Sequence, residues 1–313
     1  EQTGTPALLI SAHTDTIFAQ ETDLRLRRDN DLIAGPGLGD NAIGAASLLA
    51  LARFLRTEQI TPACDIWFVA TSREEGLGDL GGMRTAFERL KPSIGSVINI
   101  EGLAYGHVYN GGIAVRRLHI KVRTEGGHSW LHFGRPSPIH GLIELGARLL
   151  TIRPSVTPRS TFNIGMIGGG TAINAIATEA YLWLDLRSET QEGLAQIEAQ
   201  VMNHVHQMRR DDLQLSVETV GDRPAGMLLA HHTLVQDALE TLRLLGVQGT
   251  LEAGSTDANI PLAASCPAVT IGITRGGNAH RLDEYIELAP IADGLRQLIV
   301  LTLITAERLA RVI

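Results

Sequence analysis

Short apolar runs alternate with helical patterns at both ends of this 313-residue sequence, and this alternation constrains the fold more than any other feature. Ala7–Ala12, Ile66–Ala70 and Val97–Ile100 have the length and continuity of strands that are buried on both faces. Ala42–Leu55, between the first two runs, has the period of a helix. Strands that alternate with helices in this way form mostly parallel sheets. We therefore expect an α/β fold in which helices cover a mostly parallel sheet.

The pattern changes between residues 113 and 225. Apolar and polar residues alternate from Leu118 to Arg123, as in a strand with one exposed face. A helix, two strands, a second helix and a last strand are then predicted over residues 139–150, 160–167, 180–186, 189–208 and 213–220. The resulting order β-α-β-β-α-β is the ferredoxin-like arrangement. Ser188, with Gln191 three residues later, is predicted to cap the second helix.

After residue 225 the first pattern returns. Helical patterns cover His231–Leu245 and Ile291–Val312, and the apolar run Ala268–Ile273 between them is typical of a buried strand. We therefore predict one discontinuous domain, residues 1–112 and 226–313, that is interrupted by a smaller α+β domain of residues 113–225.

Composition excludes several classes of protein. The chain has 44% hydrophobic residues and a net charge of -7, which is typical of a globular protein and argues against nucleic-acid or anionic-membrane partners. Uninterrupted apolar stretches stay well below the ~18 residues of a membrane span. Cys64 and Cys266 lie far apart and form no CxxC motif, so a disulfide framework is not expected. With no signal peptide visible, we expect a cytoplasmic protein.

Residues of the types that bind metals follow the predicted strands of the discontinuous domain. His13 and Asp15 follow the first strand, Glu74 and Glu75 follow the second, and further candidates are Glu101, His280 and, where a helix begins, Asp40. In an open α/β sheet, functional residues collect just past the carboxyl ends of the strands. The combined set has the composition of a two-zinc site, in which the ions lie ~3.5–4 Å apart.

Each of these residues also has an ordinary explanation when it is taken alone. Asp40 could cap a helix, the Glu74–Glu75 pair could lie in a solvated loop, and His280 could be a loop histidine. The glycines of Gly35–Gly39 have the spacing GxGxG rather than GxGxxG, and Asp40 would place a negative charge at a phosphate site. We therefore reject a dinucleotide site. The metal-centre hypothesis rests on the set as a whole.

These motifs resemble the co-catalytic zinc peptidase family, which includes peptidase T, glutamate carboxypeptidase, aminoacylase and acetylornithine deacetylase. The resemblance runs from the first strand to the last helix and includes the inserted domain. It implies two zinc ions per chain, with Co²⁺ or Mn²⁺ as alternatives. It further implies that His13 and Glu101 hold one ion, that Glu75 and His280 hold the other, and that Asp40 bridges them.

The same resemblance implies roles for neighbouring residues. Asp15 matches the carboxylate that supports the first histidine, and Glu74 matches the general base. The peptide bond Asp40–Asn41 is expected to be cis.

The inserted domain carries matches of its own. His128 matches the histidine that stabilises the oxyanion, usually in the active site of a dimer partner, although His132 and His140 lie nearby. Asn174 matches a residue that contacts substrate, although Ala177 stands where the family often has proline. The resemblance also implies a homodimer formed through this domain.

Two further matches concern substrate recognition. Arg187 matches the arginine that binds a substrate carboxylate, with a surface salt bridge as the alternative. Ser255 lies in a turn that matches the family's substrate-facing turn, with a helix cap as the alternative.

The predicted function is a zinc-dependent amide-bond hydrolase. It would act on a small peptide, as an amino- or carboxypeptidase, or on an N-acyl amino acid, with a water between the metals that Glu74 activates. One alternative is an N-carbamoyl-amino-acid amidohydrolase that uses the same site. Another is a catalytically inactive binding homologue, and a third is a generic α/β binding module.

Overall fold

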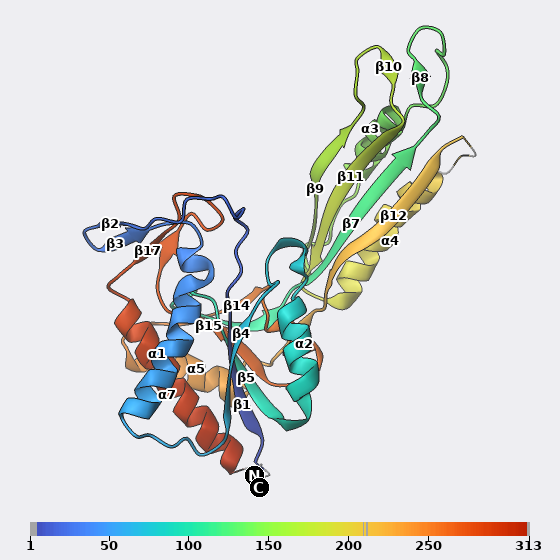
Figure 1. Cartoon of the computed structure of the whole chain (residues 1–313). Coiled ribbons are helices and arrows are strands. Elements are labelled where there is room, and N and C mark those ends of the chain that lie inside the picture. The colour runs from blue at the N-terminus through green and yellow to red at the C-terminus, as the bar shows by residue number, and fades with distance from the viewer. Residues whose placement is uncertain (1–4, 209, 211, 312–313) are drawn as a thin grey trace. The chain divides into compact units, whose positions relative to one another are not determined.

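A computed structural model describes residues 5–208, 210 and 212–311 of the chain (Figure 1). The chain divides into two compact units, which are described separately. The discontinuous unit consists of Glu1–Gly112 and Gly226–Ile313, and the inserted unit consists of Ile113–Ala225.

The discontinuous unit is built around a mostly parallel sheet. Its strands are ordered β13-β6-β15-β5-β1-β4, and β14 also pairs with β6. Neighbouring strands among β4, β1, β5 and β15 run parallel, whereas β6 is antiparallel to β15. The strands are β1 (Ala7–His13), β4 (Ile66–Thr71), β5 (Ile94–Ile100), β6 (His107–Gly112), β13 (Gly226–Met227), β14 (Thr250–Gly254) and β15 (Ala268–Ile271). The predicted α/β fold class is confirmed.

Helices pack against both faces of this sheet. Side chains alternate along a strand, so Leu8 and Ile10 of β1 join one apolar cluster and Leu9 joins another. The first cluster includes side chains of α1 (Ile43–Thr57), α5 (Thr233–Leu244) and α7 (Ile291–Ala310). The second includes side chains of α2 (Gly81–Leu90) and α6 (Asn259–Ala263). The predicted end of α7 at Val312 lies outside the described residues.

Helix α1 is unusually apolar. By length and composition alone, the helical stretch Leu38–Thr57 could cross a membrane, and it is the one such stretch in the described part of the chain. However, its Leu48, Leu51 and Leu55 are buried in the core of the discontinuous unit. These contacts are those of the core helix of a globular protein.

Strand β4 departs from the prediction that it is buried on both faces. Trp67 and Phe68 are 44% and 38% exposed. Within the described chain β4 pairs with β1 alone, so it forms an edge of the sheet. An apolar run therefore predicted the strand correctly but its burial wrongly, because the run carries no information about what lies beside it.

A second, smaller sheet lies in the same unit and was not predicted. Its strands are ordered β16-β17-β3-β2 and cover Gly276–Gly277 (β16), Tyr285–Glu287 (β17), Leu32–Ala34 (β3) and Arg27–Asp29 (β2). Ala34 pairs with Tyr285. This ladder joins the segment just before Asp40 to the segment just after His280.

The inserted unit has the predicted ferredoxin-like element order. An antiparallel sheet ordered β12-β7-β11-β9 packs its apolar face against two helices. The elements are β7 (Ala114–Arg123), α3 (Pro138–Leu149), β9 (Ser160–Gly169), β11 (Glu179–Ser188), α4 (Gln191–Gln207) and β12 (Gln214–Arg223). A short pair, β8 (Gly127–His128) with β10 (Ala175–Ile176), lies at one end of the unit (Figure 1).

The predicted cap of α4 was wrong by two residues. Thr190, not Ser188, caps the helix, and its Oγ1 accepts the N–H of Gly193 at 3.0 Å. Ser188 is the last residue of β11, and its Oγ bonds to that of Ser160 at 3.0 Å. The strand thus continues through the position where the sequence pattern predicted the cap.

Candidate metal centre

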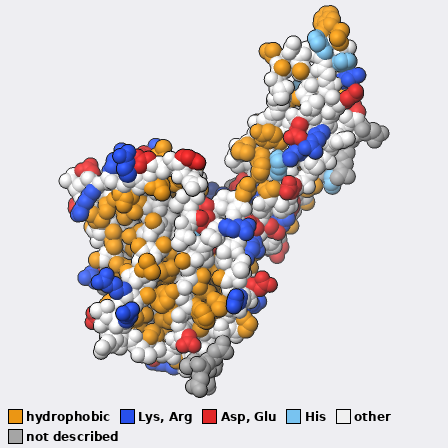
Figure 2. Space-filling model, in the orientation of Figure 1, with side chains coloured by type: hydrophobic (Ala, Val, Ile, Leu, Met, Phe, Trp, Pro, Cys, Tyr) orange, Lys and Arg blue, Asp and Glu red, His pale blue; other side chains and the backbone are white. Residues whose placement is uncertain are grey.

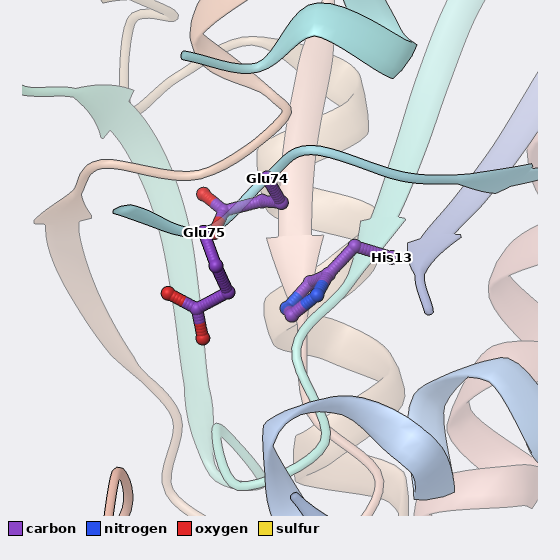
Figure 3. Close-up of side chains that lie close together, drawn as sticks. All are labelled: His13, Glu74 and Glu75. Carbon is purple, nitrogen blue, oxygen red and sulfur yellow. The ribbon is translucent and has the colours of Figure 1, made fainter. Parts of the chain in front are cut away.

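Three neighbouring parallel strands bring their carboxyl ends to one edge of the sheet. His13 ends β1, Glu74 and Glu75 follow β4, and Glu101 follows β5. Figure 3 shows the His13 ring pointing from the end of its strand toward the two glutamates. His13 and Glu74 are buried, at 1% and 6% exposure.

The first ligand group surrounds His13. Its Nε2 lies 3.0 Å from Asp40 Oδ1 and 3.5 Å from Glu101 Oε2. Its Nδ1 lies 3.0 Å from the backbone oxygen of Asp15, and because a carbonyl can only accept, Nδ1 carries the hydrogen. In a neutral ring, the Nε2 lone pair therefore faces two carboxylates, which is the orientation of a metal ligand.

The second ligand group surrounds His280. Its Nε2 lies 2.9 Å from Asp40 Oδ2 and 3.1 Å from Glu75 Oε1. Asp40 thus turns one carboxylate oxygen toward each histidine, as a bridging ligand must. Whereas His13 is buried, the His280 side chain is 51% exposed, so the second position is open to solvent.

The donor set fits a pair of metal ions. Three groups of side chains each place one donor atom per residue within 4.8 Å of the others: His13 with Glu74 and Glu75, His13 with Asp40 and Glu101, and Asp40 with Glu75 and His280. Imidazole and carboxylate donors suit zinc, and Co²⁺ and Mn²⁺ also accept nitrogen and oxygen ligands. The second and third of these groups share Asp40, and their geometry fits two ions bridged by that carboxylate.

Electrostatics at the centre favour a cation. Burial and the neighbouring charge of Asp40 raise the pKa of Glu75. Burial would lower the pKa of His13, but Asp15, Asp40 and Glu101 outweigh it and raise that pKa well above its usual range. Carboxylates crowded in this way repel one another unless positive charge lies between them.

Asp15 fixes the loop that presents the two glutamates. Its Oδ1 accepts the N–H of Glu74 at 3.1 Å, and its Oδ2 accepts that of Glu75 at 3.0 Å. Burial opposes ionisation, but His13 and these two N–H groups prevail and lower the pKa of Asp15 to about 2. Asp15 therefore supports both the histidine and the Glu74–Glu75 turn.

The Asp40 loop is fixed to the end of β5. Asp40 lies in a single turn, η1 (Leu38–Ala42), and the Asp40–Asn41 peptide bond is cis, as the family resemblance predicts. The buried Asn41 donates from Nδ2 to the Ile100 oxygen at 2.7 Å and accepts the Gly102 N–H at 2.9 Å. The two bonded residues, Ile100 and Gly102, are the neighbours of Glu101 in the sequence, so Asn41 ties the Asp40 loop to the backbone on both sides of Glu101.

Sequence reasoning missed three residues that hold the ligands in place. Asn41 was named only for its expected cis peptide bond, and no role was assigned to its side chain. Asn99 donates to Glu101 Oε1 at 3.3 Å and accepts from Ser11 Oγ at 2.8 Å. Glu284 accepts backbone N–H groups of the Asp40 loop. Glu284 stands directly before the short strand β17, which is only a weak sequence signal for a functional role. No pattern in the sequence pairs Glu284 with Asp40.

The inserted unit brings His128 and Asn174 together. His128 pairs with Ala175 in the β8–β10 ladder, and Ser129 donates its N–H to the Asn174 oxygen at 3.0 Å. His128 Nδ1 accepts the Trp130 N–H at 3.2 Å, so in the neutral ring Nε2 carries the hydrogen and is a donor. His132 instead uses its Nδ1 to accept the backbone N–H of His128 at 2.8 Å.

Neither of the other two candidates belongs to the ligand groups or to the His128–Asn174 pair. Arg187, on β11, donates from Nε to Asp185 Oδ2 at 2.6 Å, and Arg117 contacts the other oxygen of Asp185 at 3.1 Å. The salt bridge considered as an alternative for Arg187 is thus present. Ser255 follows β14, in the discontinuous unit, and the N-cap position of α6 is occupied by Ala258.

Comparison with known proteins relates the sequence to a family of peptidases. The model of peptidase family M20/M25/M40 matches residues 9–302. Acetylornithine deacetylase of Proteus mirabilis is 25% identical over 309 residues, which cover 91% of this chain and 76% of that protein.

Solved structures share the fold. A tripeptidase from Staphylococcus aureus superposes with a TM-score of 0.76 at 22% identity, over 98% of this chain and 83% of the other. A dinuclear metal-binding peptidase from Bacillus subtilis superposes with a TM-score of 0.66 at 16% identity, over 97% and 82% of the two chains. Because the family model covers nearly the whole sequence, the chain belongs to peptidase family M20/M25/M40.

Proposed function

We propose that this chain is a dinuclear zinc hydrolase that cleaves an amide bond in small peptides or N-acyl amino acids. Family membership makes it a hydrolase of amide bonds. The observation that carries the finer proposal is the placement of Asp40, whose two oxygens lie 3.0 Å and 2.9 Å from the imidazoles of His13 and His280. A carboxylate shared in this way supports two metal positions rather than one.

Glu74 is the proposed general base. Bound zinc would lower the pKa of a water and polarise the carbonyl of the scissile amide. Glu74 is buried, and the hydrogen bond from its N–H to Asp15 fixes its position. It would take a proton from the attacking water and return it to the leaving amine.

Residues of the inserted unit would bind the substrate. His128 presents Nε2–H as a donor, which suits the oxyanion that develops on the carbonyl oxygen. Asn174 lies beside it and would contact the substrate. Arg187 would exchange part of its ion pair with Asp185 for a substrate carboxylate. Ser255, in the discontinuous unit, would also contact the substrate.

We also infer a homodimer formed through the inserted unit. Strand β9 is the last strand of its sheet, so its outer edge has no partner strand among the described residues. Met166 and Ile167 of β9 and Ile143 of α3 are more than half exposed, at 53%, 56% and 59%. Exposed apolar patches mark interaction surfaces. Light scattering should give twice the mass of one chain, and Ile167→Glu should shift the protein toward the monomer.

A cytoplasmic location stays a prediction.

A substrate panel tests the proposed reaction. Protein stripped with a chelator and reloaded with zinc is given dipeptides and tripeptides, N-acetyl amino acids and N-carbamoyl amino acids. We expect turnover of a peptide or an N-acyl amino acid that disappears with the metal. Glu74→Gln should keep its zinc and lose turnover by roughly 10²–10⁴-fold. Glu88→Gln, an exposed glutamate on α2, is the matched control. Turnover of N-carbamoyl substrates alone would support the alternative amidohydrolase, and no turnover of any member would support an inactive homologue.

A further inference from the structure

Glu284 is a fully buried carboxylate four residues after His280. Its Oε1 accepts the backbone N–H groups of Gly39 at 2.5 Å and Asp40 at 2.9 Å. Its own backbone oxygen accepts the N–H of Gly35 at 2.8 Å. The segment that presents His280 therefore holds the loop that presents Asp40 at three points.

The environment of Glu284 is unusual for a carboxylate. None of the described basic side chains forms an ion pair with it, and its Oε2 has no hydrogen-bond partner among the described residues. A buried charge is costly unless it is paired. Two backbone N–H groups offset part of that cost, because hydrogen bonds to an ionised acceptor are about twice as strong as neutral ones. The N–H groups of Gly39 and Asp40 are thus the hydrogen-bond partners of the Glu284 carboxyl group among the described residues.

The loop around His280 needs an anchor. Asn278 and His280 have φ values of 58° and 68°, in the left-handed region that residues other than glycine rarely adopt. The surrounding structure must hold such residues in place. Besides the His280–Asp40 contact, the β3–β17 ladder and the Glu284 bonds tie this loop to the Asp40 loop.

Asp15 provides a parallel within the same site. Its carboxylate accepts the N–H groups of two consecutive residues, Glu74 and Glu75, just as Glu284 accepts those of Gly39 and Asp40. Besides His280, the proposed ligands of the second metal position are Glu75 and Asp40. The backbone of each of their loops is thus held by a carboxylate from another segment. The family resemblance assigned a role to Asp15 but none to Glu284.

We propose that Glu284 is a positioning residue that sets the distance between Asp40 and His280, and thereby the affinity of the second metal position. This inference rests on the proposed function, because it assumes that the two residues share a metal ion. Glu284 does not touch that ion. It acts by fixing the backbone of Gly39 and Asp40 so that Asp40 Oδ2 faces His280 Nε2.

The test is a zinc titration of the full chain in competition with a chromophoric chelator. Wild type, Glu284→Gln and Glu284→Ala are compared with Glu287→Gln, a control in the neighbouring strand β17. We expect Glu284→Ala to weaken one of two binding steps by about 10–100-fold, the range found for residues that orient metal ligands. Glu284→Gln should weaken the same step less, by roughly tenfold, because its amide oxygen still accepts the two N–H groups.

The outcomes separate the inference from the proposed function. If Glu284→Gln binds both ions with wild-type affinity, the inference is wrong, and this variant decides the question even if Glu284→Ala does not fold. If both variants unfold more easily without metal but bind zinc normally, Glu284 is only structural and the inference is again wrong. If wild type itself binds no zinc, the proposed function fails instead.

Discussion

The candidate metal centre and the β8–β10 end of the inserted unit (the tip) hold their proposed functional residues in different ways. At the centre, Asp15, Asn41 and Glu284 connect ligand loops that are far apart in the sequence. At the tip, His128 and Asn174 are exposed, and their contacts stay within the β8 and β10 loops. The centre is thus organised before anything binds, whereas the tip presents donors to the solvent.

The surroundings of the tip strengthen the contrast. Large apolar side chains flank His128 and Asn174, and Trp130, Phe133 and Ile173 are 84%, 92% and 104% exposed. Figure 2 shows hydrophobic side chains gathered at this end of the inserted unit. Such exposure is typical of a surface that becomes covered on binding. Substitutions at the candidate metal centre should therefore reduce metal binding, whereas substitutions at the tip should reduce catalysis without affecting metal binding.

Asp40→Ala should have the largest effect of any single substitution. Both imidazoles face this one carboxylate, so the variant should lose at least one zinc and most turnover. Because metal ions contribute several kcal/mol of transition-state stabilisation, the rate should fall by about 10³-fold or more. Metal content measured by mass spectrometry, with turnover, checks this. Asp29→Ala, in the exposed strand β2, is the control and should retain two ions. Full zinc content in Asp40→Ala would contradict the bridging role.

His128→Ala should separate the two regions. We expect kcat to fall by roughly 10²–10³-fold, as for the loss of one oxyanion donor. Zinc content should not change, since His128 lies in the inserted unit and the metal groups lie in the other unit. Steady-state kinetics and metal analysis check both halves, with His140→Ala on α3 as the control. An unchanged kcat would remove His128 from the mechanism.

Arg187→Ala should have a smaller effect that is specific to one substrate group. A hydrogen bond to a charged partner is worth about 1.5–3 kcal/mol, so KM should rise by roughly 10–100-fold for substrates with a free carboxylate. Substrates whose carboxylate is amidated should be unaffected. Arg123→Ala, which breaks the exposed ion pair with Glu179 in the same sheet, is the matched control. An equal rise in KM for both substrate types would contradict carboxylate binding by Arg187, and the salt bridge with Asp185 would then be its role.

The smallest expected effect is the titration of His119 in the inserted unit. Burial, with Lys121 nearby, lowers the pKa of this histidine below 6.5, and its ring stacks on Trp183 at 4.0 Å. A lowered pKa means that the unfolded chain binds the proton first. His119 therefore stabilises the fold above pH 6.5, and this contribution decreases as the pH falls toward the folded pKa. An NMR titration should show an inflection below 6.5 that Lys121→Gln moves upward. An inflection at or above 6.5 in wild type would contradict this account.

The proximity of the side chains at the candidate centre could be predicted because most of them lie near the ends of recognisable strands. His13 and Glu101 directly follow apolar runs and Glu75 lies a few residues beyond one, and parallel strands bring such positions to one edge. The element order of the inserted unit was equally predictable, since each strand and helix has its own period.

The remaining contacts could not be predicted, for physical reasons. The bonds from Gly39 and Asp40 to Glu284 span 245 and 244 residues, and they depend on how two irregular loops approach each other. Likewise, the exposure of Trp67 in β4 depends on what lies beside the strand. Periodicity describes a segment and its own faces, not its neighbours.

The most direct test of the account is an anomalous-scattering map of zinc-loaded crystals. We predict two peaks per chain, ~3.5–4 Å apart, with one beside His13 and Glu101, the other beside Glu75 and His280, and Asp40 between them. A single peak, or zinc bound away from Asp40, would contradict the dinuclear centre on which the proposed function rests.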